Sequence, residues 1–215
     1  MSDRTDPDAT IVGRYRRLVA EADAWFARAL AAHRAEARCG RGCDGCCRGL
    51  FDVTPLDAAL LRAGLDAAPA AARTAILEAA RAALAAVRDA APEWAPPYRL
   101  GDLGVPRFDA LCETLDEVPC PCLAADGACR LYEHRPLVCR LHGLPMWDPG
   151  EEAFVGGDCP RNLPPENLED KPALHFDHAS FEARELRLMA ELAGPEAASD
   201  PEACGTIIAA ALLAP

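Results

Sequence analysis

The sequence predicts a mainly α-helical protein whose helices pack around irregular, cysteine-rich, metal-binding loops, with few or no strands. Three observations predict this class. Apolar residues recur at intervals of three and four, which is the spacing of one helix face. Most of the 11 cysteines lie in two tracts rich in glycine or proline, and no segment alternates as a strand does. We therefore expect one domain over residues 1–215, with a metal core at about 39–160 and flanking helices at 10–38 and 177–213.

The first helix is predicted to run from Ile11 to about Ala37. Its apolar residues follow a 4-3-4-3-4 spacing, while arginine and glutamate side chains fall outside this stripe. The helix leads directly into the first group of cysteines. The apolar stripe consists of Ile11, Tyr15, Leu18, Ala22, Trp25 and Ala29.

Two further helices are predicted in the next forty residues or so. Thr54 is expected to cap the first of them, because its hydroxyl can accept a hydrogen bond from the first turn, and Pro55 suits the first helical position. Gly64 is expected to close that helix. Pro69 is expected to open the second, alanine-rich helix, which reaches about Ala90.

The rest of the chain shows weaker signals. Residues 92–106 are rich in proline and predict an extended surface loop. Residues 108–114 fit one or two helical turns, and a short hairpin is considered at 154–155. Two more helices are predicted, at 177–193 and, capped by an aspartate before a proline, at 201–212.

The charge of the chain excludes several functions. Asp and Glu number 34 against 22 Lys and Arg, which gives a formal net charge of −12. This balance disfavours binding to nucleic acids or anionic lipids, because both need cations that face phosphates. No run of about 18 apolar residues occurs, so no membrane span is predicted. The polar first ten residues do not resemble a secretory signal, and we expect a cytoplasmic location.

The high cysteine content has two ordinary explanations, a disulfide scaffold in a secreted protein or thiolate ligands of a metal in a reducing compartment. The cysteine count is odd and the cysteines are tightly clustered. Together with the missing signal segment, these features favour metal.

The first cysteine tract holds Cys39, Cys43, Cys46 and Cys47. Cys43 and Cys46 form a C-x-x-C pair, a spacing that lets a tight turn bring two thiolates to one ion. Glycines between these cysteines allow the backbone to bend. Adjacent side chains point apart in most backbone conformations, so Cys46 and Cys47 are expected to serve two metal centres or opposite sides of one larger centre.

The second tract extends from Cys120 to Cys159, and 72 residues separate Cys47 from Cys120. Metal that joins the two tracts would staple distant parts of the chain. Pro136 fits the first position of a short helix that carries Cys139. Arginines beside the cysteines would lower thiol pKa values and offset thiolate charge. These arginines are Arg38, Arg41, Arg48, Arg130, Arg140 and Arg161.

The cysteine pattern resembles that of the YkgJ-like cysteine-cluster family, a zinc- or iron-chelating domain. The resemblance rests on C-x-x-C-C in the first tract and on C-P-C-L-x5-C-R-L-Y-E-H-R-P-L-V-C-R in the second. Cys39 departs by one residue in its spacing, and Cys122 occupies a position where the family has an aromatic residue, so Cys122 is expected to be an extra thiol. The resemblance implies eight metal ligands: Cys39, Cys43, Cys46, Cys47, Cys120, Cys129, Cys139 and Cys159.

Other polar residues near the tracts are given structural roles. Cys112 and Cys204 lie in apolar helical contexts and are expected to be buried thiols. His142 follows Cys139 at C-x-x-H spacing, and we favour a hydrogen bond to the backbone over metal ligation. Three residues of the second tract are expected to lock its loop rather than perform chemistry: Tyr132, Glu133 and Arg135.

The leading functional hypothesis is a metal-binding protein with an iron–sulfur cluster and/or zinc in a structural or redox-linked role. Four cysteines suit either metal, so spacing does not separate them. Metal ions are the expected partners, and a protein partner is also considered. The alternative is an S-adenosylmethionine-dependent protein lysine methylase, because the resemblance extends to flagellin methylases. The chain lacks a glycine-rich strand–helix fingerprint for such a cofactor, so enzymatic activity is left open and disfavoured.

Overall fold

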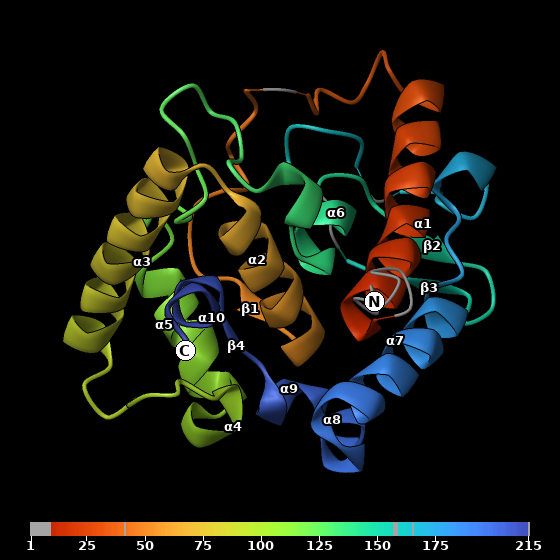
Figure 1. Ribbon diagram of the computed structural model, residues 1–215. Helices are drawn as coiled ribbons and strands as arrows, with labels where there is room; N and C mark the ends of the chain where they lie inside the picture. The colour runs from red at the N-terminus through yellow and green to blue at the C-terminus, as the bar shows by residue number, and fades with distance from the viewer. Residues whose placement is uncertain (1–9, 41, 157–158, 165, 215) are drawn as a thin grey trace, which may run out of the picture.

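The computed structural model describes residues 10–40, 42–156, 159–164 and 166–214, and within them the fold is mainly α-helical, as expected (Figure 1). The longer helices are α1 (Ile11–Ala32), α2 (Pro55–Ala67), α3 (Ala70–Ala90), α5 (Val105–Thr114) and α7 (His178–Ala193). The shorter ones are α4 (Leu100–Leu103), α6 (Leu137–Leu141), α8 (Pro195–Ser199), α9 (Pro201–Cys204) and α10 (Ile208–Leu213), with 3₁₀ turns η2 (Tyr132–His134) and η3 (Pro172–Leu174). The strands are two residues long: β1 (Asp52–Val53), β2 (Trp147–Asp148), β3 (Ala153–Phe154) and β4 (Thr206–Ile207).

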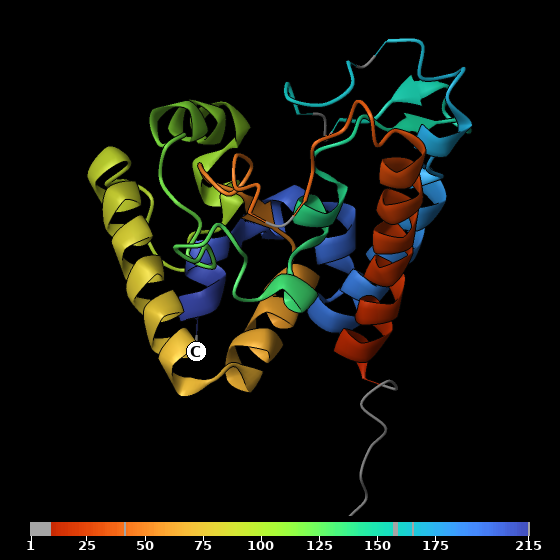
Figure 2. The same cartoon turned by 90° about the horizontal axis from the view of Figure 1, so that it is seen from above.

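The helices form two groups with α2 between them (Figures 1 and 2). Helices α3, α4, α5 and α10 lie on one side, and α1, α7 and α8 lie on the other. Each group encloses its own buried apolar cluster. Helix α2 serves both, because Leu61 and Leu65 enter the first cluster while Leu56 and Leu60 enter the second. Helix α2 therefore joins the two cores, because two of its faces are apolar and each face enters a different core.

Helix α1 carries the predicted apolar stripe into the second core, where Tyr15 and Trp25 are almost fully buried. The Thr10 hydroxyl caps its first turn by accepting a hydrogen bond from the Gly13 amide at 3.0 Å. The helix ends at Ala32, five residues earlier than predicted. Beyond it the chain makes a tight turn in place of further helix, in which two successive amides donate to the carbonyl of residue 33.

Helix α2 begins as predicted and ends later. Thr54 and Asp57 cap it reciprocally, each side chain accepting from the other's backbone amide. The expected stop at Gly64 is wrong, since the helix continues to Ala67. Gly64 instead allows a close approach: a Cβ there would lie 2.6 Å from the Cβ of His134. The glycine therefore marks packing against the second cysteine tract rather than a helix end.

The segment 92–106 is not the extended surface loop that its prolines predict. Trp94 and Tyr98 are 2% and 4% exposed and their rings pack edge to face, with centroids 5.5 Å apart. The Trp94 indole donates to the carbonyl of Arg99 at 2.8 Å. Helix α4 follows within the same segment. Burial of two large aromatic rings stabilises the segment, which proline content alone does not reveal.

The C-terminal part also differs from the prediction. In place of one helix over 201–212, α9 and α10 are separated by strand β4, which pairs antiparallel with β1 so that Asp52 faces Ile207. The pair places α10 against α2 and α3. The considered hairpin is confirmed, since Trp147 and Asp148 pair with Phe154 and Ala153. In the described part of the chain, none of the helices combines the length and apolar character needed to cross a bilayer.

Candidate metal centre

The two cysteine tracts lie side by side, joined by their backbones. The Cys120 amide donates to the Cys47 carbonyl at 2.8 Å, and the Gly49 amide donates to the Val118 carbonyl at 2.8 Å. An isolated antiparallel bridge joins the residues between these bonds. Backbone hydrogen bonds thus bring together two tracts that are separated by 72 residues in the sequence, and this pairing does not depend on any side chain.

A close approach of two glycine loops adds to this contact. Gly127 has a φ of +76°, and a Cβ at this position would lie 3.0 Å from the carbonyl oxygen of Gly42. A side chain here would separate the tracts as well as strain the backbone.

A first group of thiols gathers around Cys39. Burial raises the pKa of the Cys39 thiol, and the charges of Cys43, Cys159 and Cys46 raise it further. Cys39 and Cys159 lie 120 positions apart in the sequence. Cys43, Cys46 and Cys159 therefore lie near enough to Cys39 for their charges to act on its thiol.

Asn162 holds this group in place, and sequence reasoning missed it. Its Nδ2 donates to the Cys39 sulfur at 3.0 Å, while its Oδ1 accepts from the Arg38 amide at 2.8 Å. Gly143 packs on the same sulfur, since a Cβ there would lie 2.9 Å from it, and its φ is +119°. The only signal in the sequence is that Asn162 follows Cys159 by three positions.

A second group of thiols forms within the second tract. Interaction with the thiols of Cys120 and Cys129 raises the pKa of Cys122. The charges of Cys120 and Cys129 also act on Cys139, which is carried by α6. The ligand roles of Cys120, Cys129 and Cys139, and the expectation that Cys122 is an extra thiol, stay predictions.

The ionisation of this group is uneven. A hydrogen bond from Cys122 lowers the pKa of Cys129 to about 7, with the charges of Arg135 and Arg130 contributing in the same direction. The same Cys122 thiol lowers the pKa of Cys120, and the pKa of Cys122 itself is raised. Burial raises the pKa of Cys139. The neighbouring arginines thus favour a thiolate at Cys129, as the sequence predicts.

The expectation that Cys46 and Cys47 point apart is wrong. A hydrogen bond between the two thiols raises the pKa of Cys46, with burial as the next cause. Whether the pair serves two centres or one larger centre stays a prediction. Cys46 nevertheless lies within electrostatic range of Cys39 on one side and Cys139 on the other, so the pair lies between the two groups.

Buried polar contacts position the helix that carries Cys139. Pro136 is the N-cap of α6 rather than its first helical residue, which is where the sequence predicts it. The Leu137 amide donates to the buried carboxylate of Asp57 at 2.9 Å. Arg140, 4% exposed, forms an ion pair with Asp23 of α1. These contacts attach α6 to both α1 and α2, so the Cys139 sulfur has a defined position.

The loop before α6 is locked much as predicted. The Arg135 guanidinium lies 3.9 Å from the centroid of the Tyr132 ring and donates to the Tyr132 carbonyl at 2.9 Å. Its ion pair is with Asp23, while Glu133 contributes its carbonyl oxygen, which accepts from Arg140 at 2.9 Å.

The remaining candidates lie outside both groups. Burial raises the pKa of Cys112 to about 11, and its sulfur lies 4.0 Å from the Leu50 carbonyl oxygen. Cys204 is half-buried against the second core. The His142 ring packs edge to face on Phe51, with centroids 6.3 Å apart.

The chemistry of the donor set fits zinc or iron, because both metals accept four thiolates. All 11 cysteines are free thiols. Among the residues that the structure describes, no three side chains of His, Cys, Asp or Glu already converge as a complete ligand set. Coordination of a metal would therefore require the thiols to move from the positions seen.

A helical scaffold that pairs two distant thiol-rich loops defines a thiolate metal-binding protein. Comparison with protein families gives the particular family: residues 38–155 match the model of the CxxCxxCC family, described as a "Putative zinc- or iron-chelating domain". The match covers more than half of the chain, which therefore belongs to this family. Neither the curated proteins nor the solved structures gave a match.

Proposed function

We propose that the protein holds zinc or an iron–sulfur cluster between its two cysteine tracts in a structural or redox-linked role. The backbone pairing of Cys47 with Cys120 carries the proposal, since it brings the tracts together. Eight cysteines serve as ligands: Cys39, Cys43, Cys46, Cys47, Cys120, Cys129, Cys139 and Cys159.

Electrostatics supports this role. Burial, together with the charges of neighbouring cysteines, raises the pKa values of Cys39 and Cys139, because thiolates near one another repel each other. A bound cation would remove this repulsion and convert it into attraction. Such a centre would lie between the two helix groups, which supports treating residues 1–215 as a single domain. The reduced thiols that it needs suit a cytoplasmic location.

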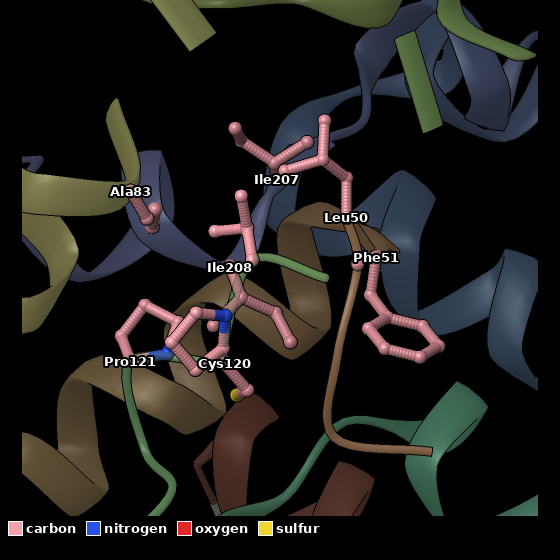
Figure 3. A pocket seen from close by; sticks show the side chains of 11 residues that line it. Leu50, Phe51, Ala83, Cys120, Pro121, Ile207 and Ile208 are labelled. Carbon is pink, nitrogen blue, oxygen red and sulfur yellow. The ribbon is translucent and has the colours of Figure 1, made fainter. Parts of the chain in front are cut away.

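The space beside Cys120 supports a structural role. A pocket lined by Cys120, Pro121, Leu50 and Ile208 has a volume of about 10 Å³ (Figure 3). This is room for about one water molecule. This cavity is too small for S-adenosylmethionine, the cofactor of the alternative methylase hypothesis.

Anaerobic purification with elemental analysis and an absorption spectrum tests the proposal. We expect a fixed molar ratio of metal to protein. Strong absorption in the violet would identify an iron–sulfur cluster, and a colourless protein that contains zinc would identify a zinc site.

Substitution tests the ligand assignment. Cys129→Ser should lower the metal content, because a hydroxyl is a poor ligand for soft metals. Cys112→Ser is the matched control and should retain the metal. A wild-type protein that retains neither zinc nor iron would refute the proposed function.

A further inference from the structure

A groove rich in arginine lies on the surface between α1 and α7, which pack along each other (Figure 1). Its volume is about 260 Å³, which is just below the range of about 300–1,000 Å³ that is usual for the sites of drug-sized ligands. None of the residues that line it belongs to a cysteine tract, so the groove is independent of the proposed metal centre. In a chain with a net charge of −12, it gathers four arginines: Arg14, Arg17, Arg184 and Arg187.

The two helices bring the same residue pattern to this groove. Residues 14–21 of α1 and residues 184–191 of α7 both read R-x-x-R-L-x-x-E. This spacing places both arginines, the leucine and the glutamate on one face of each helix.

The ends of the two patterns pair reciprocally across the groove. The Arg184 guanidinium donates to the two carboxylate oxygens of Glu21 at 2.8 and 2.9 Å. Arg14 binds both carboxylate oxygens of Glu191 in the same way from the other helix. The first residue of each pattern thus meets the last residue of the other. The helices are therefore antiparallel here, and an approximate two-fold axis relates the two halves of the groove.

The middle of the groove carries the excess of positive charge. Four guanidinium groups against the two carboxylates at the ends leave a formal excess of two charges. Arg17 and Arg187 are the arginines nearer the axis, beside Leu18 and Leu188, which also line the groove. The Arg187 Nε donates to the Ala183 carbonyl at 2.9 Å, so this side chain is held along its own helix. A ligand with two negative charges would balance the excess.

We infer that the groove binds a small dicarboxylate, with one carboxylate on Arg17 and the other on Arg187. A site with two-fold symmetry matches a ligand with two like ends. The planar guanidinium matches a carboxylate in two-pronged geometry, and the end pairs of this groove already show that geometry. A carbon chain between the carboxylates would cover Leu18 and Leu188, which favours a dicarboxylate over an inorganic polyphosphate.

Isothermal titration calorimetry with succinate and glutarate tests the inference. The titration is run at low ionic strength, because salt screens exposed charges. We expect saturable binding of one dicarboxylate per chain, tighter than that of acetate or inorganic phosphate. Arg17→Gln and Arg187→Gln should each weaken binding about 10-fold or more, because each removes a charged hydrogen-bond donor. The two factors should be similar, because the axis makes the positions equivalent.

Arg28→Gln is the matched control, since Arg28 is an exposed arginine of α1 that does not line the groove. Arg17 and Arg187 are exposed as well, so all three variants should fold, and circular dichroism checks this. The metal content of the variants should equal that of the wild type, which keeps this test separate from that of the proposed function.

Absence of saturable binding of both dicarboxylates would overturn the inference. Equal affinity for acetate or phosphate would also overturn it, because a single anionic group would then suffice. A loss of affinity in Arg28→Gln as large as in the groove variants would reduce the effect to net charge. A loss in only one groove variant would contradict the two-fold arrangement.

Discussion

At the scale of single residues, Asn162 shows why a cysteine pattern does not describe a whole metal centre. Its amide contacts the Cys39 sulfur and the backbone beside it, and it lies 123 positions from that cysteine. Spacing rules identify ligands, but they do not identify the groups that orient those ligands through space.

Asn162→Asp should weaken metal retention at the Cys39 group. The aspartate can still accept from the Arg38 amide, but it replaces a donor to the sulfur with a negative charge. Loss of such an orienting contact costs about 10-fold or more in metal affinity. The rate of metal transfer to a chelator measures the effect, and exposed Asn167→Asp is the control. Equal rates in both variants would remove Asn162 from the site.

At the scale of elements, boundaries set by the local sequence were predictable, such as the ends of α3 at Ala90 and of α7 at Ala193, and boundaries set by distant segments were not. The caps at Thr10 and Thr54 depend on a hydroxyl and the next turn, which the local sequence contains. The interruption between α9 and α10 depends instead on pairing with Asp52 and Val53, some 150 positions earlier. Gly64 was misread because its partner, His134, belongs to another tract.

The junction of α1, α2 and α7 contains a buried polar cluster that no pattern predicted. The Tyr15 hydroxyl lies 2.8 Å from an Asp57 oxygen and 3.0 Å from a Glu185 oxygen. A hydroxyl has one proton to donate, so the second carboxyl group must carry its own. Burial, followed by the charges of Asp57 and Glu182, raises the pKa of Glu185 to about 7. The junction is therefore expected to hold Glu185 protonated in mildly acidic solution.

Stability should consequently fall as the pH rises from about 4.5 to about 7. The folded state binds the Glu185 proton more tightly than the unfolded state over this interval, so raising the pH favours unfolding. The pKa difference corresponds to a change on the order of 3 kcal/mol. Glu185→Gln should flatten this dependence, measured by urea unfolding at several pH values. Exposed Glu191→Gln is the control, and an unchanged slope in Glu185→Gln would contradict the assignment.

At the scale of the whole molecule, the sequence predicted one helical, metal-binding domain but not its division into two cores. The division depends on α2, whose opposite faces enter different clusters. An apolar pattern reveals that a face is buried, but not which partner covers it. The cysteine loops also connect the two groups of helices. Bound metal and α2 are therefore each expected to hold the two cores together.

Metal removal should lower the melting temperature of both cores together. Structural zinc contributes on the order of 10 kcal/mol, comparable to the stability of a whole domain. Trp94 reports on the first core and Trp25 on the second. Trp147 also packs against the second core. Fluorescence melting of the double variant Trp25→Phe/Trp147→Phe, which keeps only Trp94, and of Trp94→Phe, with and without chelator, should show coincident shifts. A transition that moves in only one variant would show that the cores melt independently, and no shift after verified metal removal would contradict a structural role.

The pairing of β1 with β4 has a consequence for the order of assembly during synthesis. Both cysteine tracts leave the ribosome before residues 206–213, which supply the partner strand of β1 and the buried face of α10. All the cysteines of both tracts are therefore synthesised before the first core can close. Contacts of such large sequence separation form slowly. Metal that is captured in this interval would hold the tracts in register until the final strand arrives.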